Sequence, residues 1–362
     1  MTMRVLVAGV CGIVAVASAQ SPSAPGFESL PYAPRHAICY RAPTPPAIDG
    51  RLDDGAWARA PWSEPFVDIE GDRKPAPRFL TRTKLLWDAD YLYIAADMEE
   101  PDVWATLTGR DSAIFQDNDF EVFIDPDGDT HNYYELEVNA LGTAWDLMLV
   151  KPYRDGGPPI NAWDIAGLRL GVQVRGTINR PGDHDQGWSV ELALPWQVLR
   201  EAAPGKRPPS AGDHWRVNFS RVEWQVERSG GRYQKITDPA TKALVPENNW
   251  VWSPQGAIAM HMPERWGVVQ FADAAPAAFV DDPDDRVKWA LRRLYYRQRD
   301  VHDKTGRYAG DLAALDASAV TIDEVAFNPV LSATASMYEI VARGANGTMV
   351  HIAQDGRTWV TR

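Results

Sequence analysis

The chain has 362 residues, a net charge of −12 and a pI near 5.1. This length allows more than one domain. The acidic balance argues against a nucleic-acid partner, since such partners are bound by clustered Lys and Arg. The sequence also contains fifteen tryptophans, which is a high count. Most tryptophans fill hydrophobic cores, so we expect only a few to remain for stacking against a ligand.

The N-terminus has the pattern of a secretory signal peptide. Arg4 precedes an apolar run over residues 5–16, and Ala17-Ser18-Ala19 follows as a cleavage pattern. We expect residues 1–19 to be removed and the protein to be secreted, to the periplasm or outside the cell. Cleavage leaves Cys39 as the single cysteine, so no internal disulfide can form. No later apolar run approaches the length of a membrane span.

The next 250 residues have the pattern of short strands joined by turns. Residues 20–45 are rich in Pro, Ser and Ala, and we expect them to run extended over the surface. Period-two runs bounded by Gly, Pro and Asp then predict strands at residues 81–87, 91–97, 120–124, 133–140, 143–150, 168–178, 187–194, 215–226 and 266–271, with a short helix at 195–199. This spacing predicts an all-β antiparallel β-sandwich over residues 46–272.

The C-terminal region has a different pattern. Residues 273–282 form a linker rich in Ala and Pro, and apolar residues at helical spacing predict a helix over residues 284–304. Short strands are expected at residues 338–342, 349–354 and 358–360. We therefore predict a small C-terminal α+β appendage over residues 283–362, which could bind a partner protein.

The strand at residues 133–140 has one polar face. Tyr133, Glu135, Glu137 and Asn139 alternate with apolar residues, so they share one side of the strand. Two carboxylates, an amide and an aromatic ring are an unusual surplus of hydrogen-bonding groups for a strand. We therefore regard this face as the leading functional candidate. A glycosidase pair of carboxylates would be one use for it, but the spacing does not favour catalysis over binding.

Three aspartates precede this strand in one turn. Asp125, Asp127 and Asp129 alternate around Gly128, and carboxylate oxygens suit a hard cation such as calcium. The alternative is an acidic hairpin turn, in which the aspartates bind only their own backbone.

Six segments together resemble carbohydrate-binding module family 9. They read, in order, IDGRLDDGAWARA, TKLLWDADYLYIAADM, FQDNDFEVFIDPDGD, YYELEVNALGT, GWSVELALPWQVL and NWVWSPQGAIAMHMPERWGVVQF. The resemblance implies a β-sandwich that binds mono-, oligo- or polysaccharides, often at glycan ends. It also implies structural calcium and no catalysis by the module itself.

The resemblance also assigns residues to a sugar site. Glu121 and Asn139 match the Glu and Asn that bind sugar hydroxyls in the family. Phe115 takes the place of the first stacking Trp, and Glu137 takes the place of an Arg, which reverses the charge. Where the second Trp is expected, before Pro263, the sequence has Met260, His261 and Met262.

Other side chains could complete such a site. Trp145 and Trp163 could supply stacking rings, since a sugar presents an apolar face to aromatic side chains. Arg110 and Arg154 could replace the missing arginine, or they could be ordinary surface charges.

The sequence therefore predicts a secreted non-catalytic carbohydrate-binding protein that acts in polysaccharide degradation. One alternative is a haem-binding domain of the DOMON type, whose available ligands would be His131, Met98, Met148, His261 and Met262. A second alternative is a scaffolding sandwich that has lost sugar binding.

Overall fold

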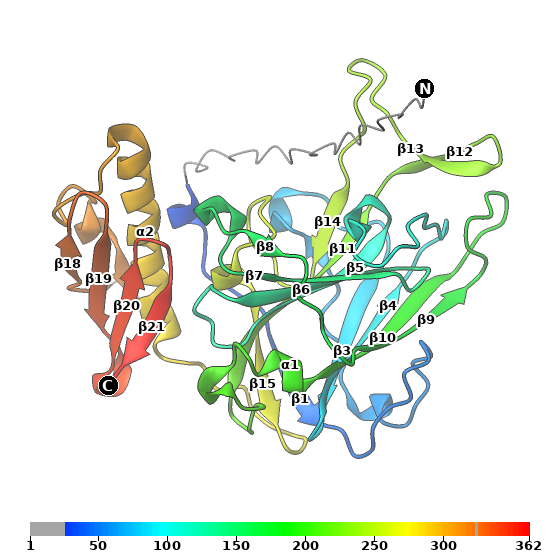
Figure 1. Cartoon of the computed structure of the whole chain (residues 1–362), viewed down its shortest axis with the longest axis horizontal. Helices are drawn as coiled ribbons and strands as arrows, with labels where there is room; N and C mark the ends of the chain where they lie inside the picture. The colour runs from blue at the N-terminus through cyan, green and yellow to red at the C-terminus, as the bar shows by residue number, and fades with distance from the viewer. Residues whose placement is uncertain (1–25, 323–324) are drawn as a thin grey trace, which may run out of the picture.

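The computed structural model describes residues 26–322 and 325–362. The predicted signal peptide, residues 1–19, lies outside the described residues. The described chain forms a large β-sandwich, and a long helix with a separate small sheet packs against one end of it (Figure 1). The predicted fold class, an all-β sandwich with a small α+β appendage, is confirmed.

The sandwich is built from one continuous, curled sheet. Its hydrogen-bonded order is β8-β7-β6-β5-β11-β15-β1-β3-β4-β10-β9, and β14 pairs with β11 and β2. The strands are β1 (His36–Arg41), β2 (Val67–Asp68), β3 (Thr81–Trp87), β4 (Tyr91–Met98), β5 (Asp119–Asp125), β6 (Tyr133–Asn139), β7 (Ala144–Leu149), β8 (Pro159–Ile160), β9 (Arg169–Arg175), β10 (Gly187–Pro195), β11 (His214–Glu223), β14 (Asn248–Val251) and β15 (Gly267–Ala272). A short hairpin of β12 (Val226–Ser229) and β13 (Arg232–Lys235) projects from β11, and α1 (Trp196–Leu199) follows β10.

The core lies between the two halves of the curled sheet. Because side chains alternate along a strand, Phe120 and Val122 of β5 point inward, as do Leu136 and Val138 of β6. They belong to one buried cluster with residues of β4 and β10, such as Val190. The same alternation sends Glu121 and Glu137 to the outer face, so the core fixes which side chains the outer face presents.

The first strand differs from the sequence-based expectation. The segment at residues 20–45 was expected to run over the surface, but β1 lies inside the sheet, parallel to both β15 and β3. Cys39 of β1 is fully buried in the core. This strand joins the two halves of the sandwich, and its pairing partners are too distant in sequence for a local pattern to reveal them.

The meander β5-β6-β7 carries the polar strand face predicted from the sequence. Its first turn places Gly128 at φ 65°, and its second places Gly142 at φ 76°. Both values lie in the left-handed region that favours glycine. The two turns fix the register, which sets Glu121 opposite Glu137 and Glu137 opposite Trp145.

The appendage contains α2 (Asp285–Thr305) and a four-stranded sheet of β18 (Val330–Ala333), β19 (Tyr338–Arg343), β20 (Met349–Ala353) and β21 (Thr358–Thr361). A small pair, β16 (Thr321–Ile322) and β17 (Val325–Ala326), precedes that sheet. Buried Leu291 and Leu294 of α2 pack with Ile340 and Ile352 in a core of their own. No helix in the described part of the chain is long and apolar enough to cross a membrane.

Charged contacts attach the appendage to the sandwich. Arg216 of β11 pairs with Asp285 at 2.7 Å, and Arg357 pairs with Asp129 at 2.8 Å. Glu264, in the short helix before β15, accepts a hydrogen bond from Tyr296 of α2. The appendage is therefore docked through several partly buried ion pairs and not only through the linker.

Candidate functional site

Four carboxylates occupy the outer face of β5 and β6. Asp119 and Glu121 lie on β5, and Glu135 and Glu137 lie on β6. All four are buried, with exposed fractions of at most 5%. We call Asp119, Glu121, Glu135 and Glu137 the carboxylate face. A buried carboxylate is costly unless it is paired, so this group is unusual for a structural strand pair.

Burial and mutual repulsion shape the titration of these groups. Burial raises the pKa of Glu121 to about 7, and it holds the pKa values of Asp119, Glu135 and Glu137 well above their ordinary values. The charge of Glu121 raises the pKa values of the other three further. The face therefore favours either protons or a positively charged group.

Two oxygens of the face lack any hydrogen-bond partner. Asp119 Oδ1 accepts a hydrogen bond from the Val222 amide at 3.2 Å, and Glu137 Oε2 accepts one from the Phe115 amide at 2.8 Å. Asp119 Oδ2 and Glu121 Oε2 are buried and unpartnered. Buried polar atoms are nearly always hydrogen-bonded in folded proteins, so these two atoms call for an explanation.

An apolar surface adjoins the carboxylates at one end. The ring centroids of Phe115 and Trp145 are 6.4 Å apart and their planes are tilted by 31°. Both rings are half-buried, and the Trp145 Nε1 atom has no hydrogen-bond partner. Because the rings contact each other, they form one apolar surface and not a slot between two parallel rings. We call Phe115 and Trp145 the aromatic pair.

A second aromatic group lies at the other end of the face. His261 Nε2 lies 4.0 Å from Glu135 Oε1, and His261 Nδ1 is 3.0 Å from the Tyr133 hydroxyl. Exposed Tyr153 packs against the His261 ring, with centroids 4.5 Å apart. Burial and the nearby Arg154 charge lower the pKa of His261 to about 3, so its imidazole is neutral at pH 7.

The predicted ligand role of Asn139 does not agree with its contacts. Asn139 is fully buried, and its Nδ2 donates to Leu107 O at 2.9 Å and to Asp117 Oδ2 at 3.0 Å. Its Oδ1 accepts from the Leu141 and Thr143 amides, both at 3.1 Å. A primary amide has two donor hydrogens and two acceptor lone pairs, so all of them are used. Asn139 therefore holds the β6-β7 turn and has no capacity left for a ligand.

Trp163 lies on the wrong side of the sheet for the predicted stacking role. Its ring stacks on Tyr134, with centroids 4.6 Å apart and planes 9° apart. Tyr134 points to the opposite side of β6 from Glu135 and Glu137 because side chains alternate. Trp163 packs against the main core and does not reach the carboxylate face.

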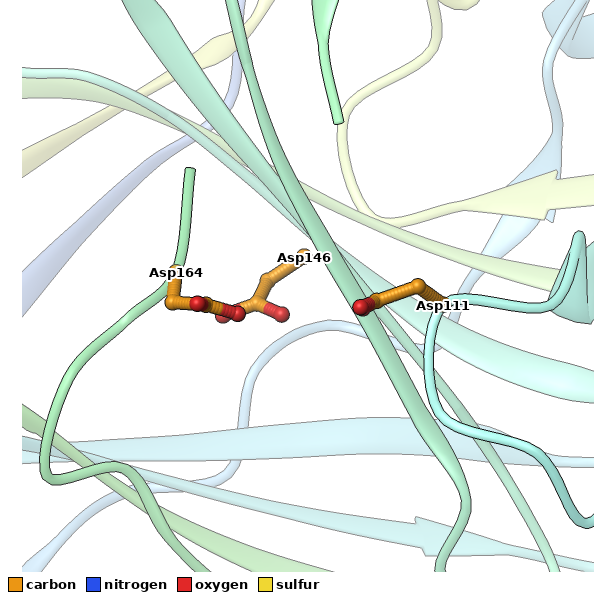
Figure 2. A group of neighbouring side chains, drawn as sticks. All are labelled: Asp111, Asp146 and Asp164. Carbon is orange, nitrogen blue, oxygen red and sulfur yellow. The ribbon is translucent and has the colours of Figure 1, made fainter. Parts of the chain in front are cut away.

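The two predicted arginine clamps are engaged elsewhere. Arg154 donates to His261 O at 2.7 Å and to Glu264 at 2.7 and 2.9 Å, so it holds the loop at the appendage junction. Arg110 pairs with Asp146 and Asp164. Figure 2 shows these two carboxylates converging with that of Asp111. Asp146 lies on the opposite side of β7 from Trp145, so Arg110 does not belong to the carboxylate face.

The turn with the three aspartates is explained by its own contacts. Asp125 accepts hydrogen bonds from the Gly128 amide at 3.0 Å and the Thr130 amide at 2.9 Å. Asp129 accepts from the His131 amide at 2.7 Å and pairs with Arg357. The carboxylate oxygens of the turn lie within 4.8 Å of one another. Turn amides and Arg357 bind Asp125 and Asp129, but burial and the neighbouring Asp129 still raise the pKa of Asp127 to about 6, so calcium in this turn stays a prediction.

The residues available for haem ligation are dispersed. Met98 is buried in the main core and Met262 in the core of the appendage. Met148 packs against the main core, and His131 faces Asp355 at 3.6 Å. These side chains have packing or surface roles in separate parts of the structure.

Two surface hollows lie on another part of the sandwich. One, of about 320 Å³, is lined by Trp62, Glu64 and Phe279, and the other, of about 350 Å³, by Trp62, Asp97 and Arg175. Neither is lined by a residue of the carboxylate face or by the aromatic pair. The carboxylate face and these two hollows therefore lie at different places, and we favour the face because it holds buried carboxylate oxygens without hydrogen-bond partners.

The structure adds site residues that the sequence did not single out. Tyr153 packs against the His261 ring, and Met260 and Trp145 pack against the same buried cluster. Strand alternation had already placed Glu135 with Glu137 on the polar face of the strand at residues 133–140. Tyr153 and Met260 lie on loops, and no local pattern predicts where they meet the face.

The fold is a β-sandwich, and its β5-β7 side presents the carboxylate face and the aromatic pair. The family model described as "Carbohydrate family 9 binding domain-like" matches residues 48–272. The chain therefore belongs to the carbohydrate-binding module family 9-like proteins.

Solved structures of the same family are similar to this chain. One is a family 9 module from Caldicellulosiruptor kristjanssonii in complex with cellotriose, with 17% identity and a TM-score of 0.43. The match covers 68% of this chain and 99% of that module. The same kind of module in complex with glucose has 16% identity and a TM-score of 0.43, and the match covers 67% and 100%. A search of curated proteins finds no match.

Proposed function

We propose that this protein is a secreted, non-catalytic carbohydrate-binding protein whose ligand contacts the carboxylate face and the aromatic pair. The observation that carries the proposal is the position of Phe115 and Trp145 beside Glu137, on the outer face of β5-β7. A sugar needs an apolar ring under its C–H face and polar groups for its hydroxyls. Family membership supports the same function, and cellotriose and glucose are ligands of similar modules.

Secretion is proposed from the N-terminal signal pattern, and a role in polysaccharide degradation from the kind of ligand. The absence of catalysis is proposed from the family. A chromogenic glycoside or a cello-oligosaccharide incubated with the protein should remain intact by chromatography. Release of product would contradict the non-catalytic assignment.

The aromatic pair provides the sharpest test. Trp145→Ala should weaken cellotriose binding about 10-fold or more in calorimetry, because stacking on an aromatic ring is lost. Trp359→Ala is the matched control, since Trp359 is also a half-buried strand tryptophan but lies in the appendage. Equal affinities of Trp145→Ala and the wild type would contradict the proposed site. Failure of the wild type to bind any glycan in a broad array would contradict the function.

A further inference from the structure

Three acidic clusters in the described part of the chain have the spacing of a metal site. In each, carboxylate oxygens from three residues lie within 4.8 Å of one another: Asp111, Asp146 and Asp164; Asp119, Glu121 and Glu137; Asp125, Asp127 and Asp129. Spacing alone does not make a metal site, because acidic groups gather for other reasons. The partners of each cluster distinguish them.

An arginine pairs with members of two of the clusters. In the first, whose three aspartates Figure 2 shows, Arg110 pairs with Asp146 and Asp164, and Asp146 also accepts a hydrogen bond from the Ile165 amide at 2.5 Å. Arg357 pairs with Asp129 in the third cluster. In each of these two clusters a guanidinium already supplies one positive charge.

The middle cluster has no such partner. Among the ion pairs of the described residues, none joins a Lys or Arg to Asp119, Glu121 or Glu137. Asp119 is 0% exposed and Glu121 is 4% exposed, and the buried atoms Asp119 Oδ2 and Glu121 Oε2 have no hydrogen-bond partner. Two amides, from Val222 and Phe115, are the hydrogen-bond donors to Asp119 and Glu137. Two amides cannot balance three buried carboxylates.

We propose that Asp119, Glu121 and Glu137 bind a divalent cation of the calcium class at the base of the carboxylate face. Oxygen is the preferred donor of Ca²⁺, at about 2.3–2.6 Å, so oxygens on opposite sides of one ion are about 4.6–5.2 Å apart. The cluster matches this span. The three carboxylates come from two paired strands, a rigid support for a ligand set.

The cation would also have a role in ligand binding, and this part rests on the proposed function. Three carboxylates leave coordination positions of a six- to eight-coordinate ion open. Sugar hydroxyls next to the aromatic pair can fill such positions. The cation site then converts a negatively charged face into one that binds neutral oxygen ligands.

Calorimetric titration of CaCl₂ into the metal-stripped full-length protein tests the site without any sugar. We expect one site, with affinity reduced about 10-fold or more in Glu121→Gln and in Glu137→Gln, because ligand charge sets calcium affinity. Asp164→Asn, in the cluster that Arg110 neutralises, is the matched control and should change affinity less than about twofold. Near-UV circular dichroism shows whether each variant is folded.

If a glutamine variant does not fold, terbium luminescence of the wild type and of tryptophan variants still tests the cation site. Tb³⁺ replaces Ca²⁺ and is sensitised by a nearby tryptophan, here Trp145, which is the register partner of Glu137. Trp145→Phe should remove most of the luminescence, while Trp359→Phe should leave it unchanged.

Two outcomes would overturn the cation site. They are the absence of a heat signal with CaCl₂, and loss of calcium binding in Asp127→Asn but not in Glu121→Gln. The two proposals can fail separately. If the protein binds calcium but no glycan, the cation site stands and the proposed function is wrong. If it binds a glycan but no calcium, the proposed function stands and the cation site is wrong.

Discussion

Glu121 and Glu137 are direct register partners across the β5-β6 ladder, and both carboxylates are buried. Like charges in this arrangement are destabilising, and low polarity around them increases the cost. A pair of this kind is expected at a binding surface, because residues that bind a ligand are retained there even when they lower the stability of the fold.

Glu137→Gln should stabilise the metal-free protein by about 1 kcal/mol, because it removes one of two opposed charges. The amide oxygen of Gln can still accept the hydrogen bond from the Phe115 amide. Urea unfolding in EDTA at pH 8 measures the change. Glu227→Gln is the control, since Glu227 is exposed and opposite a neutral residue, Gln234. A Glu137→Gln variant less stable than the wild type would contradict the account.

Asn139→Ala should destabilise the protein by about 2–3 kcal/mol, because four hydrogen bonds are lost, two within the β6-β7 turn and two to Leu107 and Asp117. Once folded, the variant should bind cellotriose with nearly unchanged affinity. Thermal unfolding and calorimetry measure the two effects. If the Asn139→Ala variant lost affinity for cellotriose but kept the stability of the wild type, Asn139 would be a ligand-binding residue after all.

Acid should weaken the junction between sandwich and appendage. Burial alone would raise the pKa of Glu264, but the charges of Arg154 and Arg292 and the Tyr296 hydroxyl outweigh it and hold this pKa at about 2. The unfolded value is about 4.5, so the unfolded state binds more protons between pH 4.5 and pH 2. The stabilisation is therefore present above pH 4.5 and is lost as the pH falls towards 2.

Glu264→Gln tests this pH dependence. The variant should be less stable than the wild type by about 3 kcal/mol at pH 7, because it leaves the buried Arg154 without its carboxylate. The difference should shrink as the pH approaches 2. Urea unfolding at several pH values measures it, and a difference independent of pH would show that the ion pair is not its source.

Phe115→Trp should strengthen cellotriose binding about threefold to tenfold, because a larger ring extends the apolar surface under the sugar. Calorimetry measures the affinity. Phe79→Trp serves as the control, since Phe79 packs on Trp250 and is not part of the aromatic pair. Weaker or unchanged binding by Phe115→Trp would mean that the sugar does not lie on this ring.

The fold was largely predictable because its signals are local. Alternation and turn residues predicted β3, β4, β5, β6 and β10 nearly to the residue, and helical spacing predicted α2. The position of β1 was not predictable in this way. Its partners β15 and β3 are brought to it by the whole topology, and its flanking Pro and Ser residues suggested a surface segment.

The site was predictable only in part. The family resemblance assigned Glu121 and Glu137 to one site, and the structure places them opposite each other, with Phe115 and Trp145 beside Glu137. Asn139 was misjudged because a sequence shows which groups a side chain has but not which partners already use them. Arg154 was misjudged for the same reason, since its partner Glu264 is distant in sequence.

The most direct test of the central claim is a crystal structure of the protein grown with cellotriose and CaCl₂. We expect one sugar ring to stack on Phe115 and Trp145. We also expect one ion within about 2.3–2.6 Å of oxygens from Asp119, Glu121 and Glu137. Sugar density in the hollows around Trp62 instead, with the carboxylate face empty, would contradict it.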